Sequence, residues 1–95
     1  MTLDPDTVEL RRGDARYEAL VAGELASQAS YHRRGDVVVL PHTETDPAFG
    51  GQGLAGRLVR FALDDIRSQG LMVEPACPFV ADWIAGHPEY SDLVA

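Results

Sequence analysis

Three glycines lie within four positions directly before a long amphipathic segment of the chain. Gly50, Gly51 and Gly53 precede an apolar pattern that begins at Leu54 and recurs with the period of a helix. The N–H groups of a helix's first turn have no partner within the helix, and the helix dipole adds partial positive charge there. Glycines let a phosphate approach that backbone because no Cβ intervenes. The pattern favours a phosphate site made of backbone groups, with a flexible glycine turn as the alternative.

The identity of the phosphate ligand depends on the strand before the glycines. Gly51-x-Gly53-x-x-Gly56 matches the dinucleotide fingerprint, and Glu74 follows about twenty residues on, where a ribose-binding acid belongs. In a dinucleotide fold the strand runs almost directly into the first glycine. Here the nine residues from Pro41 to Phe49 are expected to separate the strand from the glycines. This linker, the antiparallel strands upstream and the lack of further βαβ units argue against a dinucleotide fold. No Gly-Lys-Ser/Thr follows the glycines, so the loop is not a P-loop either.

Short strands are expected in the first half of the chain. Apolar and polar residues alternate there, and turn signals recur about ten residues apart, which is typical of an antiparallel meander. The fourth run, Val37 to Leu40, is continuously apolar, as in a central strand buried on both faces. The expected strands lie around Val8–Arg11, Tyr17–Val21, Leu25–Tyr31 and Val37–Leu40, with turns at Gly13-Asp14, Gly23 and Gly35-Asp36.

In the second half of the chain the apolar residues recur with the period of a helix. Apolar residues from Leu54 to Gln69 fall on one side of a helix, and Gly70 stands where a C-terminal cap belongs. Leu71 to Val73 is a short buried strand. A second helix is expected from Pro78 to His87, and a last helical turn from Glu89 to Val94. The order of four strands, helix, strand and helix defines an α+β domain.

Composition restricts the class of protein. The 95 residues are expected to form a single domain, residues 1–95. Acidic residues outnumber basic ones by 15 to 8, and the net charge is −7. A domain that binds a nucleic-acid backbone needs a basic surface, so no nucleic-acid partner is expected. The acidic surface suits a cationic partner, although it also serves solubility.

The cysteine and the chain's hydropathy bear on location. Cys77 is the single cysteine, so no disulfide can form within the chain, which fits a reducing compartment. The segment Met1 to Glu9 has no apolar run, so we expect no signal peptide. No stretch approaches the ~20 apolar residues of a membrane span. We therefore expect a cytoplasmic protein, a monomer or weak homodimer, with no membrane partner. His32, His42 and His87 lack metal-ligand spacing with the cysteine, so no metal is expected.

The linker and glycines resemble a known family. A strand, a Pro-containing linker and Arg/Gln-x-x-Gly-x-Gly/Ala at a helix start form motif A of the GNAT acetyltransferases. Gly50-x-x-Gly53-x-Ala55 resembles it, with glycine in place of Arg or Gln. The stretch from Pro41 to Val94 is similar, more narrowly, to very small stand-alone GNAT-like proteins. The matching motifs are His42-Thr43-Glu44, Gly51-Gln52-Gly53-Leu54-Ala55, Pro75-Ala76-Cys77-Pro78-Phe79 and His87-Pro88-Glu89-Tyr90.

This resemblance implies a minimal GNAT fold and acetyl-CoA as the cofactor. The pyrophosphate would lie on the glycine loop and the pantetheine arm where the fourth and fifth strands part. Its amides would pair with backbone near Thr43 to Thr45, although Thr43 is equally well read as a plain strand residue. Arg57 is a candidate for the 3′-phosphate, with a solvated arginine as the alternative. The residues expected to hold acetyl-CoA are Thr43, Thr45, Gly50, Gly51, Gln52, Gly53, Leu54, Ala55, Gly56 and Arg57.

Four residues are candidates for the chemistry of transfer to an amine, which needs a base and a proton for the leaving thiolate. His42 and Glu44 share a face of a regular strand, and either is a candidate base. A bulge there would change which residue points inward. Cys77 opens the second helix, where a thiol can become nucleophilic, but a lone cysteine is commonly a buried hydrophobe. Tyr90 is a candidate proton donor, or else a packing residue.

Two functions are consistent with these residues. The first is an acetyl-CoA-dependent N-acetyltransferase with an unknown amine or protein acceptor. The second is an acyl-CoA-binding module with little catalysis that acts through a protein partner. The early strands are joined by short turns, so the acceptor wall that larger GNAT enzymes build there is missing. Phe79 and Trp83, four apart on the second helix, are expected in the core or the cleft wall, and His87 is expected to cap a helix end.

Overall fold

A computed structural model describes residues 7–95, so the signal-peptide expectation for Met1 to Glu9 lies mostly outside the described residues. One five-stranded sheet has the order β1-β2-β3-β4-β5. The first four strands are antiparallel neighbours, and β5 runs parallel to β4. The expected meander and the α+β class are therefore confirmed. The strands are β1 (Val8–Arg12), β2 (Arg16–Val21), β3 (Glu24–Arg34), β4 (Val37–Thr45) and β5 (Met72–Glu74).

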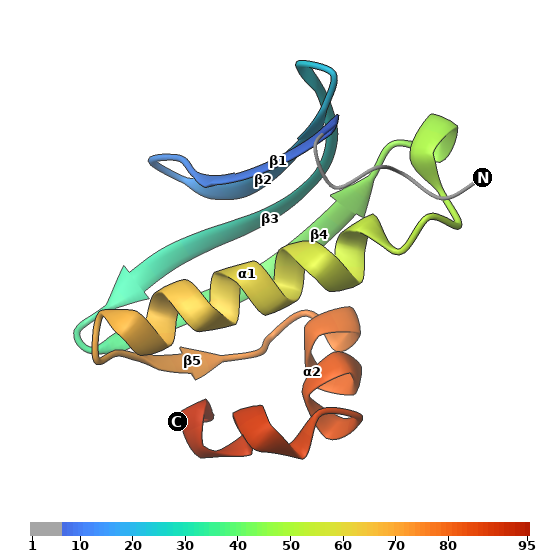
Figure 1. The fold of residues 1–95 in the computed structure, drawn as a ribbon. Coiled ribbons are helices and arrows are strands. Elements are labelled where there is room, and N and C mark those ends of the chain that lie inside the picture. Colours follow the sequence, from blue (N-terminus) through green and yellow to red (C-terminus); the bar gives the residue numbers. More distant parts are fainter. Residues whose placement is uncertain (1–6) are drawn as a thin grey trace.

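Helix α1 (Leu54–Ser68) crosses one face of the curled sheet and connects β4 to β5 (Figure 1). Its apolar side supplies the buried residues of the main core, as the helical period predicted. Gly70 caps its C-terminal end with φ +72°. The N–H of Gly70 bonds to Arg67 O and that of Leu71 to Ile66 O, which is the Schellman arrangement.

The second half of β4 corrects the sequence-based expectation. The strand does not end at Leu40 but continues to Thr45, so the nine-residue linker from Pro41 to Phe49 is wrong. Only Asp46 and the short 3-10 helix η2 (Pro47–Phe49) separate the strand from the glycines. The prediction missed this extension because Pro41 and the polar residues after it break the apolar run. β3 supplies the pairing partners that keep the polar half extended.

A β-bulge interrupts β4 at the point where its apolar half ends. Ser30 pairs with His42 and His32 pairs with Val39, so two residues of β4 lie opposite the single residue Tyr31. A proline is tolerated at such a bulge, and Pro41 is one of the two residues. Because one residue is added, the side chains beyond the bulge exchange faces relative to those before it.

The C-terminal elements pack beside the parallel pair of strands. Helix α2 (Pro78–Ala85) is shorter than expected, and the 3-10 helix η3 (Pro88–Leu93) forms the expected last turn. Figure 1 shows α2 near the N-terminal half of α1, where the paths of β4 and β5 diverge. Among residues 7–95, no helix has the length and hydropathy of a membrane span.

Candidate functional site

β4 and β5 part after a short parallel ladder. They pair from Val37–Met72 to Val39–Glu74, and the bond from Cys77 N–H to Leu40 O, 2.9 Å, is the last link between them. Beyond this point the edge of β4 has no strand beside it in the described part of the chain. The structure therefore opens a gap on the β5 side of the polar half of β4.

Backbone groups of two threonines face this gap. The carbonyls of His42 and Glu44 accept bonds from β3 side chains, and Asp46 N–H donates to Ala26 O, so these alternate residues face β3. Strand alternation then turns the N–H and C=O groups of Thr43 and Thr45 away from β3 and into the gap. These are the positions at which the family resemblance implied pairing with a pantetheine arm.

Cys77 lies at the narrow end of the gap. Its side chain is buried, and Sγ lies 3.5 Å from Thr43 Oγ1. Burial acts to raise the pKa of the Cys77 thiol, but hydrogen bonds from Thr43 and from the N–H groups of Val80 and Phe79 outweigh it. The pKa therefore lies below its usual value. Both alternatives stated for Cys77, a thiol of lowered pKa at a helix start and a buried cysteine, are consistent with this placement.

The glycine loop lies at the wide end of the gap and is fixed at both sides. Asp46 caps η2 by accepting a bond from Ala48 N–H at 2.9 Å, and this directs the chain into the loop. On the other side, Leu54 is buried against Val21 and Ala26 in a second small core. These anchors hold the loop, so its conformation depends on packing at its ends rather than on contacts of its own.

The backbone of the glycine loop is accessible to a ligand. Gly51 and Gly53 have φ values of +76° and +74°, and no atom lies within 4 Å of a Cβ built on either. Gly53 is the N-cap of α1 and offers no side-chain cap. The N–H groups from Gly51 to Gly56 have no hydrogen-bond acceptor within residues 7–95. Free N–H groups at a helix start, with glycine access, form an anion site.

A pocket of about 210 Å³ lies against these N–H groups. Thr45 and Phe79 line it from β4 and α2, so it joins the glycine loop to the open edge of β4. Phe79 is 42% exposed and is part of the cleft wall, as the sequence predicted. Gln52 Oε1 is buried and has no hydrogen-bond partner in the described part of the chain. An acceptor atom in this state fits a ligand that brings its own N–H group.

His42 and Glu44 lie together, but on the other face of the sheet. Their side chains are 67% and 64% exposed, with His42 Nε2 3.9 Å from Glu44 Oε2. The bulge explains this placement, because without it they would share the α1 face with Leu40. Gln28 Nε2 donates to Glu44 Oε2 at 3.3 Å. The two candidate bases thus flank the gap from the side opposite to Cys77.

Tyr90 lies under the outer side of α1. Its buried hydroxyl donates to Asp64 Oδ1 at 2.8 Å and accepts from Arg60 at 3.1 Å. Burial, together with the Asp64 carboxylate, raises the pKa of Tyr90 above its ordinary value. These bonds favour the packing alternative for Tyr90 and do not connect it with Thr43 or Cys77.

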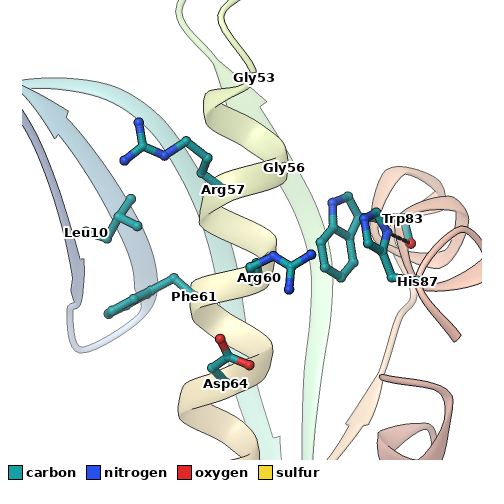
Figure 2. A pocket seen from close by; sticks show the side chains of 9 residues that line it. All are labelled: Leu10, Gly53, Gly56, Arg57, Arg60, Phe61, Asp64, Trp83 and His87. Atoms are coloured by element: carbon teal, nitrogen blue, oxygen red, sulfur yellow. Dashed lines mark hydrogen bonds between the residues drawn. The ribbon is translucent and has the colours of Figure 1, made fainter. Parts of the chain in front are cut away.

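Sequence reasoning missed part of the surface around α1. A cavity of about 420 Å³ begins at Gly53 and Gly56 and continues along the outer side of the helix (Figure 2). Arg57, a predicted residue, lines it, as does Arg60, for which no role was predicted. The signal in the sequence was the spacing of three between the two arginines, which places both on one side of a helix.

The fold and this site define a class of protein. A mixed sheet whose parallel fourth and fifth strands part beside a glycine-capped helix is the acyl-CoA N-acyltransferase fold. Two solved structures share it. A GCN5-like protein from Staphylococcus aureus aligns with a TM-score of 0.74 and 18% identity, over 94% of this chain and 89% of its own. The ribosomal-protein-S18-alanine N-acetyltransferase from Escherichia coli aligns with a TM-score of 0.58 and 22% identity, over 65% of this chain and 42% of its own.

A model of the family described as GCN5-related N-acetyl-transferase matches residues 16–93. The chain therefore belongs to the GCN5-related N-acetyltransferase family, and it is an acetyltransferase. A search of curated protein sequences found no match. The resemblance drawn from the sequence is confirmed at the level of family and fold.

Proposed function

We propose that this protein transfers the acetyl group of acetyl-CoA to an amine. One observation carries the proposal. The N–H groups from Gly51 to Gly56 lack acceptors within the described residues and lie beside the open edge of β4. A phosphate at the helix start and an extended amide chain along the strand would satisfy both sets of groups. Acetyl-CoA carries a pyrophosphate and an amide-containing arm in that order.

The residues of the loop fit the pyrophosphate. Its charge would be held by the free N–H groups and by the dipole of α1, which needs no basic side chain. Gly50 therefore serves without the Arg or Gln of the usual motif. The pantetheine amides would pair with the backbone of Thr43 and Thr45, and the unpartnered Gln52 Oε1 would accept a further N–H. Leu54, Ala55 and Gly56 contribute through their N–H groups, whereas the Leu54 side chain is a core anchor.

The acceptor amine would approach from the face that carries His42 and Glu44. A free lysine-type amine has a pKa near ~10.4 and is almost all protonated at pH 7, so it must lose a proton before it attacks. Glu44 or His42 would take this proton, directly or through water. The neutral amine nitrogen would then bond to the acetyl carbon, the carbon–sulfur bond would break, and the second proton that the nitrogen loses would go to the leaving thiolate, which gives the amide and free CoA. The hydrogen-bond donors that lower the pKa of Cys77 lie at the narrow end of the gap, where the thiolate of CoA would form.

The carboxylate and the imidazole can be told apart by rate measurements. We expect Glu44→Gln to lower the transfer rate by roughly a hundredfold at unchanged CoA affinity, since a general base contributes that much or more. Glu24→Gln is the matched control, because Glu24 is also an exposed glutamate but lies at the start of β3, and this variant should keep the rate. If His42 is the base, His42→Ala should lower the transfer rate instead and Glu44→Gln should keep it.

Equal transfer rates for wild type, His42→Ala and Glu44→Gln would contradict the assignment of a base to this face. CoA binding without transfer to any amine would instead support the acyl-CoA-binding module. The single cysteine is a free thiol, which is typical of proteins in reducing compartments, and we propose a cytoplasmic protein on this ground.

A further inference from the structure

A buried carboxylate lies on the face of the sheet opposite to α1. It belongs to Glu18 on β2, a residue that is 7% exposed, while Tyr17 and Ala19 on either side of it lie in the core under α1. Arg11 Nε donates to Glu18 Oε1 and Arg16 Nε donates to Glu18 Oε2, each at 2.7 Å. Both oxygens therefore have a cationic partner, and the buried carboxylate fixes the guanidinium group of Arg16.

Strand pairing connects Glu18 with the candidate base Glu44. Gln28 on β3 lies directly opposite Glu18 of β2 and directly opposite Glu44 of β4. Residues paired in this way share a face of the sheet, and their side chains are close enough to interact. A row of polar side chains therefore crosses three strands, from a buried carboxylate to an exposed one.

The side-chain amide of Gln28 is bonded at both of its ends. Arg16 Nη1 donates to Gln28 Oε1 at 2.6 Å, and Gln28 Nε2 donates to Glu44 Oε2 at 3.3 Å. The opposite orientation of the amide would bring Nε2 against the guanidinium, donor against donor, and Oε1 against the carboxylate, acceptor against acceptor. Arg16 therefore directs the N–H group of Gln28 toward Glu44.

The contacts of Glu44 engage one of its two carboxylate oxygens. His42 Nε2 lies 3.9 Å from Oε2, the same oxygen that accepts the bond from Gln28. Oε1 has no hydrogen-bond or ion-pair partner among residues 7–95. An exposed glutamate samples several rotamers, and a general base must lie within hydrogen-bond reach of the proton that it takes. A carboxylate restrained through Oε2 keeps Oε1 available for that proton.

We propose that Gln28 is a positioning residue for acetyl transfer, which holds the Glu44 carboxylate through Oε2 so that Oε1 meets the acceptor amine. The inference rests on the proposed function and, of the two candidate bases, it assigns the proton of the amine to Glu44. Arg16, fixed by Glu18, orients the amide of Gln28. Gln28 itself takes no proton and touches no reacting atom.

The variant Gln28→Met tests the assignment, because it keeps the length of the side chain and removes the amide. Acetylation is measured with acetyl-CoA and two probe amines, spermidine and a lysine-containing peptide. We expect kcat to fall about fivefold to tenfold, as for the loss of one hydrogen bond of ordinary strength, while KM for the amine and the affinity for CoA stay within about twofold of wild type. Gln69→Met is the matched control and should keep the rate. Gln69 Nε2 also donates to a carboxylate, that of Asp65 at 3.0 Å, but at the C-terminal end of α1.

The same substitution in a Glu44→Gln background separates positioning from a merely structural role. Because Gln28 acts through the Glu44 carboxylate, Gln28→Met should change the rate of Glu44→Gln by less than about twofold. A fall by the same factor in both backgrounds would overturn the inference. An undiminished kcat in Gln28→Met, or a full rate in Glu44→Gln, would also overturn it. Each of these outcomes leaves the proposed function standing.

The side-chain amide signals give a second readout that needs no acceptor. The chain has three glutamines and no asparagine, so only Gln28, Gln52 and Gln69 contribute side-chain amide pairs to a proton–nitrogen correlation spectrum. Arg16→Met and Glu44→Met should each shift the Gln28 pair and leave the Gln69 pair in place. A Gln28 pair that stays in place in either variant would overturn the inference. Transfer by wild type to neither amine would overturn the proposed function and, with it, the role of Gln28.

Discussion

A substitution in the glycine loop tests the phosphate site most sharply, because the two ends of α1 provide a matched pair of variants. Gly53 and Gly70 have φ values of +74° and +72°, and no atom lies within 4 Å of a Cβ on either. An alanine in this left-handed region costs about 1–2 kcal/mol. For a domain of this size that loss lowers Tm by roughly 4–16 °C. Gly53→Ala and Gly70→Ala should therefore be destabilised to a similar extent.

Of the two variants, only Gly53→Ala should bind CoA more weakly than wild type. The space above Gly53 belongs to both cavities, so the new methyl group would occupy the volume in which a phosphate approaches the N–H groups. Gly70 lines none of these cavities among residues 7–95. Loss of one charge-assisted hydrogen bond, about 1.5–3 kcal/mol, weakens binding by roughly one to two orders of magnitude.

Thermal unfolding with and without CoA measures the difference. At a CoA concentration of about 100 times the wild-type Kd, wild type and Gly70→Ala should gain about 2.7 kcal/mol of stability. Gly53→Ala should gain only about 0.4–1.4 kcal/mol at the same concentration. The same gain in both variants would refute the reasoning that the loop backbone binds the phosphates.

Three further outcomes follow from single residues. Cys77→Ala should remove any acetyl adduct that acetyl-CoA alone leaves on the protein, seen by mass spectrometry, and an undiminished transfer rate in this variant would make the thiol structural. Arg11 and Arg16 donate hydrogen bonds to the Glu18 carboxylate, and these hold its pKa below the ordinary value of 4.5 despite burial. The contribution of Glu18 to stability is therefore present above pH 4.5 and is lost as the pH falls through the lower pKa of the folded state. The Tm difference between wild type and Glu18→Gln should shrink from pH 7 to pH 3, and a constant difference would contradict this. Gly56→Ala should shift the Trp83 emission, because the new Cβ would lie 3.3 Å from the indole nitrogen; an unchanged spectrum would argue against that contact.

The sequence predicted the elements that have a strong local signal. The period of α1, its glycine C-cap and the turns of the meander are encoded by neighbouring residues, and all were found. The face on which His42 and Glu44 lie has no such signal. Their spacing correctly places them side by side, but the bulge before them is set by pairing with β3 and reverses their face.

The outer cavity was missed for a similar reason. Arg60 and Asp64 have the spacing of an ion pair on an exposed helix face, and no ligand role was predicted for the arginine. In the structure the Tyr90 hydroxyl donates a hydrogen bond to the Asp64 carboxylate. The Arg60 guanidinium lies over the rings of Tyr90 and Trp83. Tyr90 comes from η3, 26 residues further along the chain, and this long-range contact cannot be read from the helix alone.

Acetyl transfer itself is the direct test of the central claim. The protein is mixed with labelled acetyl-CoA and a panel of small amines, polyamines and amine-bearing peptides, and acetylated product and free CoA are quantified by mass spectrometry. The account predicts at least one acetylated amine, with one CoA released for each acetyl group transferred, and a decrease of both in Gly53→Ala. Stabilisation of the protein by CoA with no acetylated amine in the panel, and no CoA release above that of the variant, would contradict the claim that this site transfers an acetyl group.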